Sequence, residues 1–172
     1  MNIYLTGYRG TGKTTLGKRL SKKLGMDFVD MDRMIEKKEK RSIEEIFFTS
    51  GEKYFREVEH RVLCELAERT NLIVSTGGGV VLLPENRKII RSTGIVIYLT
   101  ADEKTIYERI KDDKNRPPLT PKPLQEEIKS LLATREPLYE ELADITLDTS
   151  LYNIKECIEK ITEFLKKKGM VI

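Results

Sequence analysis

The sequence contains few of the residue types that build disulfide scaffolds or metal clusters. Its 172 residues include two cysteines, one histidine and no tryptophan. Cys64 and Cys157 are far apart, lie in helix-like segments and belong to no CxxC pair, which argues against a disulfide framework or a zinc site. We interpret both cysteines as packing residues. His60 lies alone within a helical pattern, which favours a packed or solvated residue over a catalyst.

Long apolar runs are missing as well. No segment approaches the roughly 20 apolar residues that a membrane span requires. The first residues lead directly into a short apolar strand and a glycine loop, without the basic and apolar regions of a secretory signal. We therefore expect a cytoplasmic protein that has no membrane partner.

Neither sign of charge dominates. Lys and Arg total 31 against 28 Asp and Glu, and the resulting net charge of +3 is spread along the chain. A nucleic-acid partner would require clustered basic residues, so we expect none. The slight positive excess suits a site that receives phosphates and an anionic substrate. Gln occurs only at Gln125 while Lys and Glu are abundant, a balance found in ion-pair-rich proteins from hot environments, and we keep that source as a hypothesis.

Short apolar runs alternate with amphipathic segments along the whole chain. The runs predict strands at residues 3–6, 27–30, 71–75, 95–99 and 145–147, and the periodic segments predict helices at 13–24, 42–48, 53–70, 84–92, 102–111, 124–142 and 152–168. Ser42 and Glu45 form the pattern of a capping box, and Pro137 is expected to interrupt or kink its helix. Strands that are apolar on both faces indicate a parallel sheet between helical layers. We therefore expect one α/β domain over residues 1–172, with three α/β/α layers and a central five-stranded parallel sheet.

The segment 112–123 is polar and contains four of the six prolines, so it is expected to be irregular and exposed. It also contains Arg116. We interpret this segment as a lid that closes over a nucleotide and excludes water, with Arg116 acting on the phosphates. The alternative is a surface loop with one solvated arginine.

One motif indicates the chemistry directly. Residues Gly7 to Thr14 read GYRGTGKT and match G-x-x-x-x-G-K-[ST] between a predicted strand and a predicted helix. In this loop, backbone N–H groups and a helix N-terminus bind phosphate oxygens. Lys13 would reach the β- and γ-phosphates of ATP, and Thr14 would offer its hydroxyl to Mg²⁺. The other residues expected at the nucleotide are Gly10, Thr11, Gly12 and Thr15. The alternative is a glycine turn that only caps a helix.

GTPases, motor ATPases and metabolite kinases all share this loop. The sequence contains no Asn-Lys-x-Asp segment for reading guanine, and no apolar strand that ends in Asp-Glu as in many motor ATPases. These absences, together with the segment 112–123, favour a metabolite kinase.

The chain resembles the shikimate kinases along nearly its whole length, through several motifs in the order found in that family. These motifs are Gly7 to Thr14, Asp30-Met31-Asp32, Phe55-Arg56-Glu57-Val58-Glu59, Thr76-Gly77-Gly78-Gly79, Arg116-Pro117 and Arg135-Glu136-Pro137-Leu138-Tyr139. The resemblance implies a fold of the P-loop nucleotide kinase type. It also implies transfer of the γ-phosphoryl group of ATP to the 3-hydroxyl of shikimate, a step of aromatic amino acid biosynthesis through chorismate.

The resemblance further implies an acceptor site made by Asp32, Arg56, Gly78, Gly79 and Arg135, with a substrate-binding helical segment at about residues 32–60. Two arginines can bind the carboxylate of shikimate in a bidentate manner. Asp32 would orient the reacting hydroxyl, take its proton and help to hold Mg²⁺ through water. The two glycines would let the backbone approach the ring.

Supporting roles follow from the same resemblance. Glu59 would hold the Arg56 guanidinium in place, and Phe47 and Phe55 would wall the pocket, although aromatic residues at helical spacing are often plain core. Arg109 matches a position that packs on adenine. Lys13, Asp32 and Arg116 would form the catalytic set.

The chain departs from the family in two places. Pro118 stands where the family usually has Leu, which could stiffen the lid. The segment Asp148-Thr149-Ser150 resembles the adenine loop of the family, but the proline often found just beyond it is absent.

Several alternatives remain open at this stage. A kinase for gluconate or for a nucleoside monophosphate would use the same phosphate loop, and a nucleotide-binding switch would bind ATP without an acceptor. Arg56 and Glu59 could form an ordinary surface ion pair, and Asp30 and Asp32 could be solvated strand ends. We expect a monomer.

Overall fold

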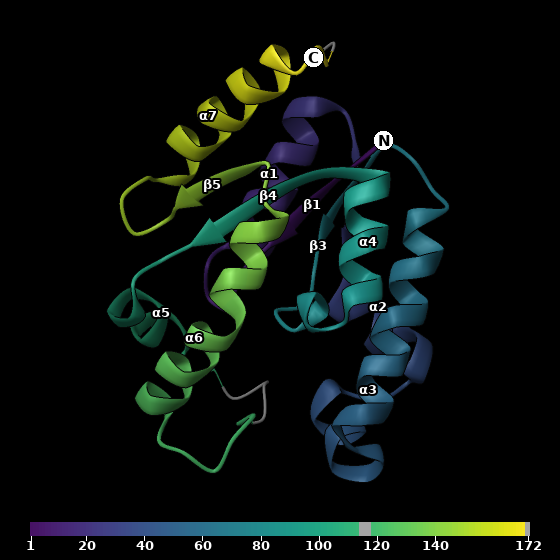
Figure 1. Ribbon diagram of the computed structural model, residues 1–172, viewed down its shortest axis with the longest axis vertical. Helices are drawn as coiled ribbons and strands as arrows, with labels where there is room; N and C mark the ends of the chain where they lie inside the picture. The colour runs from purple at the N-terminus through teal and green to yellow at the C-terminus, as the bar shows by residue number, and fades with distance from the viewer. Residues whose placement is uncertain (114–117, 171–172) are drawn as a thin grey trace.

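The computed structural model describes residues 1–113 and 118–170. Its five strands are β1 (Asn2–Thr6), β2 (Asp27–Asp30), β3 (Leu72–Ser75), β4 (Gly94–Thr100) and β5 (Ile145–Asp148). All neighbouring strands pair in parallel, in the order β2-β3-β1-β4-β5, and Figure 1 shows the sheet between its helices. The predicted five-stranded parallel sheet is therefore confirmed.

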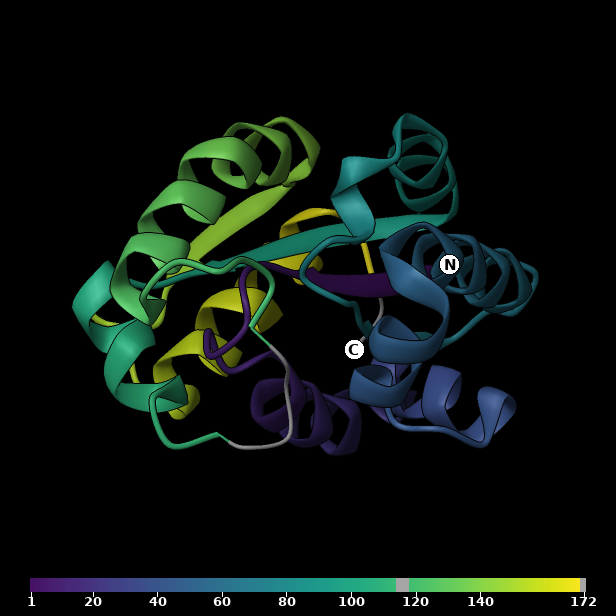
Figure 2. The ribbon, with the colours of Figure 1, turned by 90° about the horizontal axis from the view of Figure 1, so that it is seen from below.

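Helices cover both faces of the sheet. They are α1 (Lys13–Leu24), α2 (Met31–Glu39), α3 (Ile43–Ala67), α4 (Pro84–Thr93), α5 (Glu103–Ile110), α6 (Leu124–Leu142) and α7 (Ile154–Lys167), with a short 3₁₀ helix, η1, at Val80–Leu82. Figure 2 shows α4 and α6 above the sheet and α1 and α7 below it. The three expected layers are present.

Alternation along the strands divides the core in two. In β1, Tyr4 belongs to the cluster that contains residues of α2, α3, α4 and α6, whereas Ile3 and Leu5 belong to the cluster that contains residues of α1 and α7. Successive strand residues point to opposite faces, so a run that is apolar at every position must be covered on both sides. All three side chains are fully buried.

Helix α2 is an element that the sequence patterns did not predict. Asp30 caps it, because its side chain accepts hydrogen bonds from the N–H groups of Asp32 and Arg33 at 3.1 and 3.4 Å. Met31 and Ile35, one turn apart, are both fully buried. A capping aspartate followed by an i, i+4 apolar pair was the local signal for this helix.

Two predicted helices join into one. The segments 42–48 and 53–70 run together as α3, across a single non-helical residue, Gly51, with φ 80° and ψ 171°. The expected capping box is present, with Glu45 N–H bonding Ser42 Oγ at 3.1 Å and Ser42 N–H bonding Glu45 Oε2 at 2.7 Å. Helix α6 runs through Pro137 without a break, so the predicted interruption is wrong.

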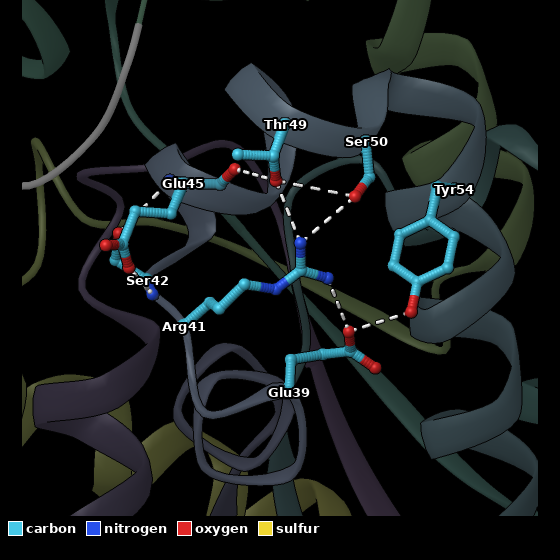
Figure 3. A network of polar contacts seen from close by, with 7 residues as sticks. All are labelled: Glu39, Arg41, Ser42, Glu45, Thr49, Ser50 and Tyr54. Atoms are coloured by element: carbon cyan, nitrogen blue, oxygen red, sulfur yellow. Dashed lines mark hydrogen bonds and ion pairs between the residues drawn. The ribbon is translucent and has the colours of Figure 1, made fainter.

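A polar network fixes the corner between α2 and α3 (Figure 3). Arg41 donates to Thr49 Oγ1 at 2.8 Å, to Ser50 Oγ at 3.0 Å and to Glu39 Oε2 at 2.8 Å. Tyr54, beyond the kink, donates to the same carboxylate oxygen at 2.8 Å. Arg41 and Glu39 together thus connect the end of α2 to both parts of α3.

No helix among residues 1–113 and 118–170 is long and apolar enough to cross a membrane.

Candidate active site

The phosphate loop follows β1 and opens α1, as the motif predicted. The Lys13 ammonium group donates to the carbonyl oxygens of Gly7 at 2.7 Å and Tyr8 at 2.8 Å, which places it inside the curl of the loop. Gly10 has φ 80°, and a Cβ there would lie 2.6 Å from Cγ2 of Ile110 on α5. Only glycine tolerates both the positive φ and the lack of space for a side chain.

A pocket opens over this loop, and we call it the phosphate pocket. It is lined by Arg9, Gly10, Gly12, Lys13, Thr14, Thr15, Asp30, Asp32, Ser75, Thr76, Arg109, Ile110 and Asp113.

Oxygen-bearing side chains gather on one wall of the phosphate pocket. Thr14 Oγ1 donates to Asp30 Oδ2 at 2.7 Å and lies 3.4 Å from Ser75 Oγ, while Asp32 lines the same pocket. Within the described part of the chain, no group of three or more His, Cys, Asp or Glu residues could hold a metal ion. Mg²⁺ is usually held by one or two carboxylates together with waters and substrate phosphates, so this wall suits it. Asp30, which the sequence left open between a functional residue and a solvated strand end, is the carboxylate that bonds Thr14.

Arg109 joins the phosphate loop to the loop after β5. Its guanidinium donates to the Gly10 carbonyl at 3.1 Å, to Thr149 Oγ1 at 2.9 Å and to the Thr149 carbonyl at 2.8 Å. Thr149 Oγ1 lies 3.1 Å from the carbonyl oxygen of Thr11. A further pocket lies beside these residues and shares Arg109 with the phosphate pocket; we call it the nucleoside pocket, lined by Gly10, Thr11, Gly12, Thr15, Leu16, Arg19, Arg109, Thr149, Tyr152, Asn153, Ile154 and Lys155. All predicted nucleotide residues within the described part of the chain therefore line one of these two pockets.

A pocket on the other side of the phosphate loop contains the predicted acceptor residues. We call it the acceptor pocket; it is lined by Tyr8, Arg9, Asp32, Ile43, Phe47, Phe55, Arg56, Glu59, Gly77, Gly78, Gly79, Leu119 and Arg135. The structure thus brings together residues from α2, α3, α6 and the loop after β3. All five residues predicted to bind the acceptor lie here.

Arg56 is held by two carboxylates of its own helix. Its guanidinium donates to Glu59 Oε2 at 2.8 Å and to Glu52 Oε1 at 3.1 Å. Glu59 is fully buried, so the reading of this pair as an ordinary surface ion pair is wrong. A Cβ on Gly79 would collide with the Arg56 guanidinium, so the absent side chain makes room for the arginine.

Glu59 lies beneath the acceptor pocket with a second carboxylate nearby. A Cβ on Gly77 would lie 2.5 Å from Glu59 Oε1 and 3.1 Å from Asp32 Oδ1. Oε1 is buried without a hydrogen-bond partner among the described residues. Burial raises the pKa of Glu59 above the usual glutamate value, against the lowering effect of Arg56, and the charge of Asp32 adds to the rise.

Arg135 reaches the pocket from α6 and is only 5% exposed. Its guanidinium carbon lies 5.9 Å from the centre of the Tyr8 ring, and Nη1 lies 3.6 Å from the Cβ position of Gly78. One turn later, the Tyr139 hydroxyl donates to the Gly78 carbonyl oxygen. Burial raises the pKa of Tyr139, so its phenol stays protonated and can donate. Helix α6 therefore supplies a cation and also anchors the glycine loop.

Aromatic side chains form the apolar wall. The rings of Phe47 and Phe55 have centroids 4.8 Å apart at an interplanar angle of 39°, and both line the acceptor pocket. They occupy the two sides of the kink at Gly51. The interpretation that these residues wall the pocket, rather than only fill the core, agrees with this placement.

Two further predictions concern Arg116 and His60. Arg116, with residues 114–117 of the proposed lid, lies outside the described residues. His60 bonds Asn86 Oδ1 at 2.7 Å and lines none of the three pockets, in keeping with a packing role.

Sequence reasoning missed several lining or anchoring residues: Tyr8, Arg9, Leu119, Glu127, Tyr139 and Thr149. Tyr139 carried a signal, since it lies one turn after Arg135 within the same motif. Thr149 also carried a signal, because the segment 148–150 resembles the adenine loop of the family. For Glu127 we find no local signal.

Comparisons with known proteins agree with this geometry. A family model described as shikimate kinase matches residues 9–166. The shikimate kinase of Pelotomaculum thermopropionicum is 41% identical over 99% of this chain and 98% of its own length. That of Thermodesulfovibrio yellowstonii is 45% identical over 93% of this chain and 92% of its own.

Solved structures of related proteins also match the fold of this chain. The structure of a shikimate kinase from Acinetobacter baumannii in complex with shikimate matches with a TM-score of 0.93 at 38% identity, covering 99% of this chain and 95% of that one. A gluconokinase from Sinorhizobium meliloti matches with a TM-score of 0.58 at 15% identity, covering 96% of this chain and 91% of that one, which shows a shared fold alone. The family match, the close relatives and the acceptor pocket agree, and the chain belongs to the shikimate kinase family.

Proposed function

We propose that this enzyme transfers the γ-phosphoryl group of ATP to the 3-hydroxyl of shikimate, giving shikimate 3-phosphate and ADP. One observation carries this proposal. The phosphate pocket and the acceptor pocket share a wall, made of Arg9 and Asp32. A nucleotide whose phosphates lie over Lys13 would therefore present its last phosphate to a small molecule bound between Arg56 and Arg135.

The acceptor pocket suits an organic acid that carries hydroxyl groups. Arg56 is held in position by two ion pairs, and Arg135 is held by packing, so both can bind a carboxylate with little loss of conformational entropy. Gly78 leaves room for a ring close to the backbone, while Gly79 leaves room for the Arg56 guanidinium that would bind the carboxylate. Asp32 lies at the shared wall, where it would orient the attacking hydroxyl and accept its proton.

The phosphate pocket suits the triphosphate. Lys13 would exchange its carbonyl contacts for oxygens of the β- and γ-phosphates, and the loop N–H groups would bind the same chain of phosphates. We propose Mg²⁺ as the cofactor; when bound, it would neutralise phosphate charge. Thr14 and Asp32 would hold it, with Asp30 beside them. Arg116 stays a proposal as the arginine that neutralises the transferred group.

We further propose a single catalytic domain over residues 1–172, in which residues 32–60 bind the acceptor and residues 112–123 act as a lid. The domain is proposed to work in the cytoplasm as a monomer, without nucleic-acid or membrane partners. Sedimentation would check the oligomeric state, because a monomer has a mass of 19.9 kDa. A measured mass of twice that value would contradict it.

An assay of ADP release with different acceptors tests the function. Purified enzyme with MgATP should release ADP rapidly when shikimate is added and slowly without an acceptor. Gluconate and a nucleoside monophosphate serve as competing acceptors on the same fold. Turnover of either at the rate of shikimate would overturn the substrate assignment, and equal ADP release without any acceptor would indicate a nucleotide switch or an ATPase.

Lys13→Ala should lower the rate of this reaction by about 100-fold or more, because a cation at the developing phosphate charge is lost. The same assay measures it. Lys18→Ala, on an exposed position of α1, removes an equal charge outside the three pockets and should leave the rate unchanged. A Lys13→Ala enzyme with wild-type kcat would exclude Lys13 from the catalytic set.

A further inference from the structure

Arg9 stands at the junction of the two pockets. The phosphate pocket and the acceptor pocket have two lining residues in common, Arg9 and Asp32. Asp32 has a proposed role in the reaction, whereas Arg9 has no role in the function proposed so far. During transfer the phosphoryl group has to pass from one pocket to the other. A guanidinium on this shared wall is therefore placed beside the path of the group.

A buried carboxylate holds Arg9 in that place. Arg9 Nη2 lies 2.7 Å from Glu127 Oε1, and the side chain of Glu127 is only 1% exposed. The other carboxylate oxygen accepts from Thr120 N at 2.8 Å and from Thr120 Oγ1 at 3.0 Å. Both oxygens of Glu127 are thus engaged. Glu127 joins the phosphate loop to α6 and to the segment that brings Leu119 to the acceptor pocket.

The Arg9 side chain also keeps capacity to bind a ligand. Only 13% of it is exposed, and its Nε is buried without a hydrogen-bond partner among residues 1–113 and 118–170. Its guanidinium carbon lies 6.0 Å from the centre of the Tyr8 ring, and that of Arg135 lies 5.9 Å from the same ring. Two guanidinium groups therefore lie around one aromatic ring at the border of the acceptor pocket.

We propose that Arg9 binds the phosphoryl group once it has been transferred, and that Glu127 is the residue that positions Arg9 for this contact. This inference rests on the proposed function, because it concerns the phosphorylated product of that reaction. Arg–phosphate hydrogen bonds are charge-assisted and frequently bidentate. Shikimate itself has no phosphate at the junction, so Arg9 adds affinity for the product and little for the substrate.

The test compares the dissociation constants of shikimate 3-phosphate and of shikimate by calorimetry. Arg9→Met, which keeps an unbranched apolar stem but removes the guanidinium and its charge, should weaken binding of shikimate 3-phosphate about tenfold or more and change that of shikimate by less than about threefold. Arg61→Met, on an exposed position of α3 outside the three pockets, removes the same charge and should change neither constant.

Glu127→Gln separates positioning from simple electrostatics. Removing a negative charge near an anion site should strengthen anion binding if only charge matters. If Glu127 positions Arg9, the same change weakens binding of shikimate 3-phosphate while shikimate binding stays nearly constant, and this second result is the one that we expect. Tighter binding of the product by Glu127→Gln would overturn the positioning role.

The experiments distinguish a failure of the proposed function from a failure of the role of Arg9. If the wild-type enzyme does not phosphorylate shikimate, the proposed function and this inference both fail. If it does, and Arg9→Met binds the product as the wild type does or loses affinity for both ligands equally, only the role of Arg9 fails. Arg9→Met leaves Glu127 buried without its cation, so the double variant Arg9→Met with Glu127→Gln carries the same test if the single variant does not fold.

Discussion

At the scale of single residues, the site depends on charged side chains that are buried away from solvent. Arg56, Arg135 and Asp32 lie near a buried Glu59, and their charges act on the pKa of that carboxyl. Burial costs a carboxylate several kcal/mol unless donors surround it. Glu59 has a donor on one oxygen, Oε2. Its raised pKa follows from that incomplete compensation.

Glu59→Gln should change how stability depends on pH. The folded pKa of Glu59 is raised above the ordinary glutamate value of 4.5, so the stabilising effect of its protonation is fully present below that value. It is lost as pH rises through the folded pKa. The free energy of unfolding of the wild type minus that of Glu59→Gln should therefore fall as pH rises across this window. Urea unfolding at a series of pH values measures it, and a difference that rises with pH would contradict it.

Arg135→Ala should weaken shikimate binding by about 1.5–3 kcal/mol, the usual value of a lost hydrogen bond to a charged group. ATP binding should change little, because Arg135 does not line the phosphate or nucleoside pockets. Calorimetry with each ligand measures both effects. Lys129→Ala, at an exposed position of the same helix, is the control. Unchanged shikimate affinity in Arg135→Ala would remove the residue from the site.

At the scale of elements, the corner between α2 and α3 positions the acceptor pocket. Helix α2 carries Asp32, and α3 carries Arg56 beyond the kink at Gly51. The Arg41 network shown in Figure 3 connects the two helices. Gly51 lies in a backbone region that is almost restricted to glycine, so the kink is a specific feature of this residue.

Arg41→Ala should raise KM for shikimate severalfold and leave KM for ATP nearly unchanged, because the corner loosens while the phosphate loop does not. Steady-state kinetics with each substrate varied in turn would show this. Lys38→Ala removes an exposed ion pair with Glu65 between the same two helices and should affect neither constant. An equal rise of both KM values would mean that the corner does not act on the acceptor pocket specifically.

At the scale of the whole molecule, two clusters of core residues share one sheet, and most strands contribute side chains to both. Neither layer can keep its core without the sheet, so the described domain should unfold in a single cooperative transition. Ligands of the native state stabilise it further by mass action.

Calorimetric scans should therefore show one transition that moves upward when shikimate is added. A concentration of 100 times Kd should contribute about 2.7 kcal/mol. Gluconate at the same concentration is the matched control and should not move the transition. Two separate transitions would contradict the single cooperative unit, and an equal shift with gluconate would contradict the acceptor assignment.

The sequence by itself determined whatever depends on short stretches of chain. The phosphate loop, the capping box at Ser42 and the doubly apolar strands were predictable because their conformations follow from spacing and residue type within one element. The acceptor residues came from the order of family motifs. The parallel sheet places Asp32, Gly78 and Gly79 at one edge because they follow neighbouring strands, whereas Arg56 and Arg135 reach the pocket from α3 and α6. Apolar spacing did not predict helix α2 because its nine residues carry only one buried i, i+4 pair, whereas the resemblance implied a helical segment at about residues 32–60 that contains most of it.

Only the tertiary structure decided which distant residues meet. Arg9 and Glu127 are 118 positions apart, and Tyr139 and Gly78 are 61 apart. No local pattern specifies such pairs, because each depends on how α6 packs over the sheet. The pair of Arg9 and Glu127 also depends on burial, since a buried carboxylate needs a cation or hydrogen-bond donors beside it. The conformation of short segments could therefore be predicted from the sequence. The wall shared by the phosphate pocket and the acceptor pocket forms only when the helices pack on the sheet.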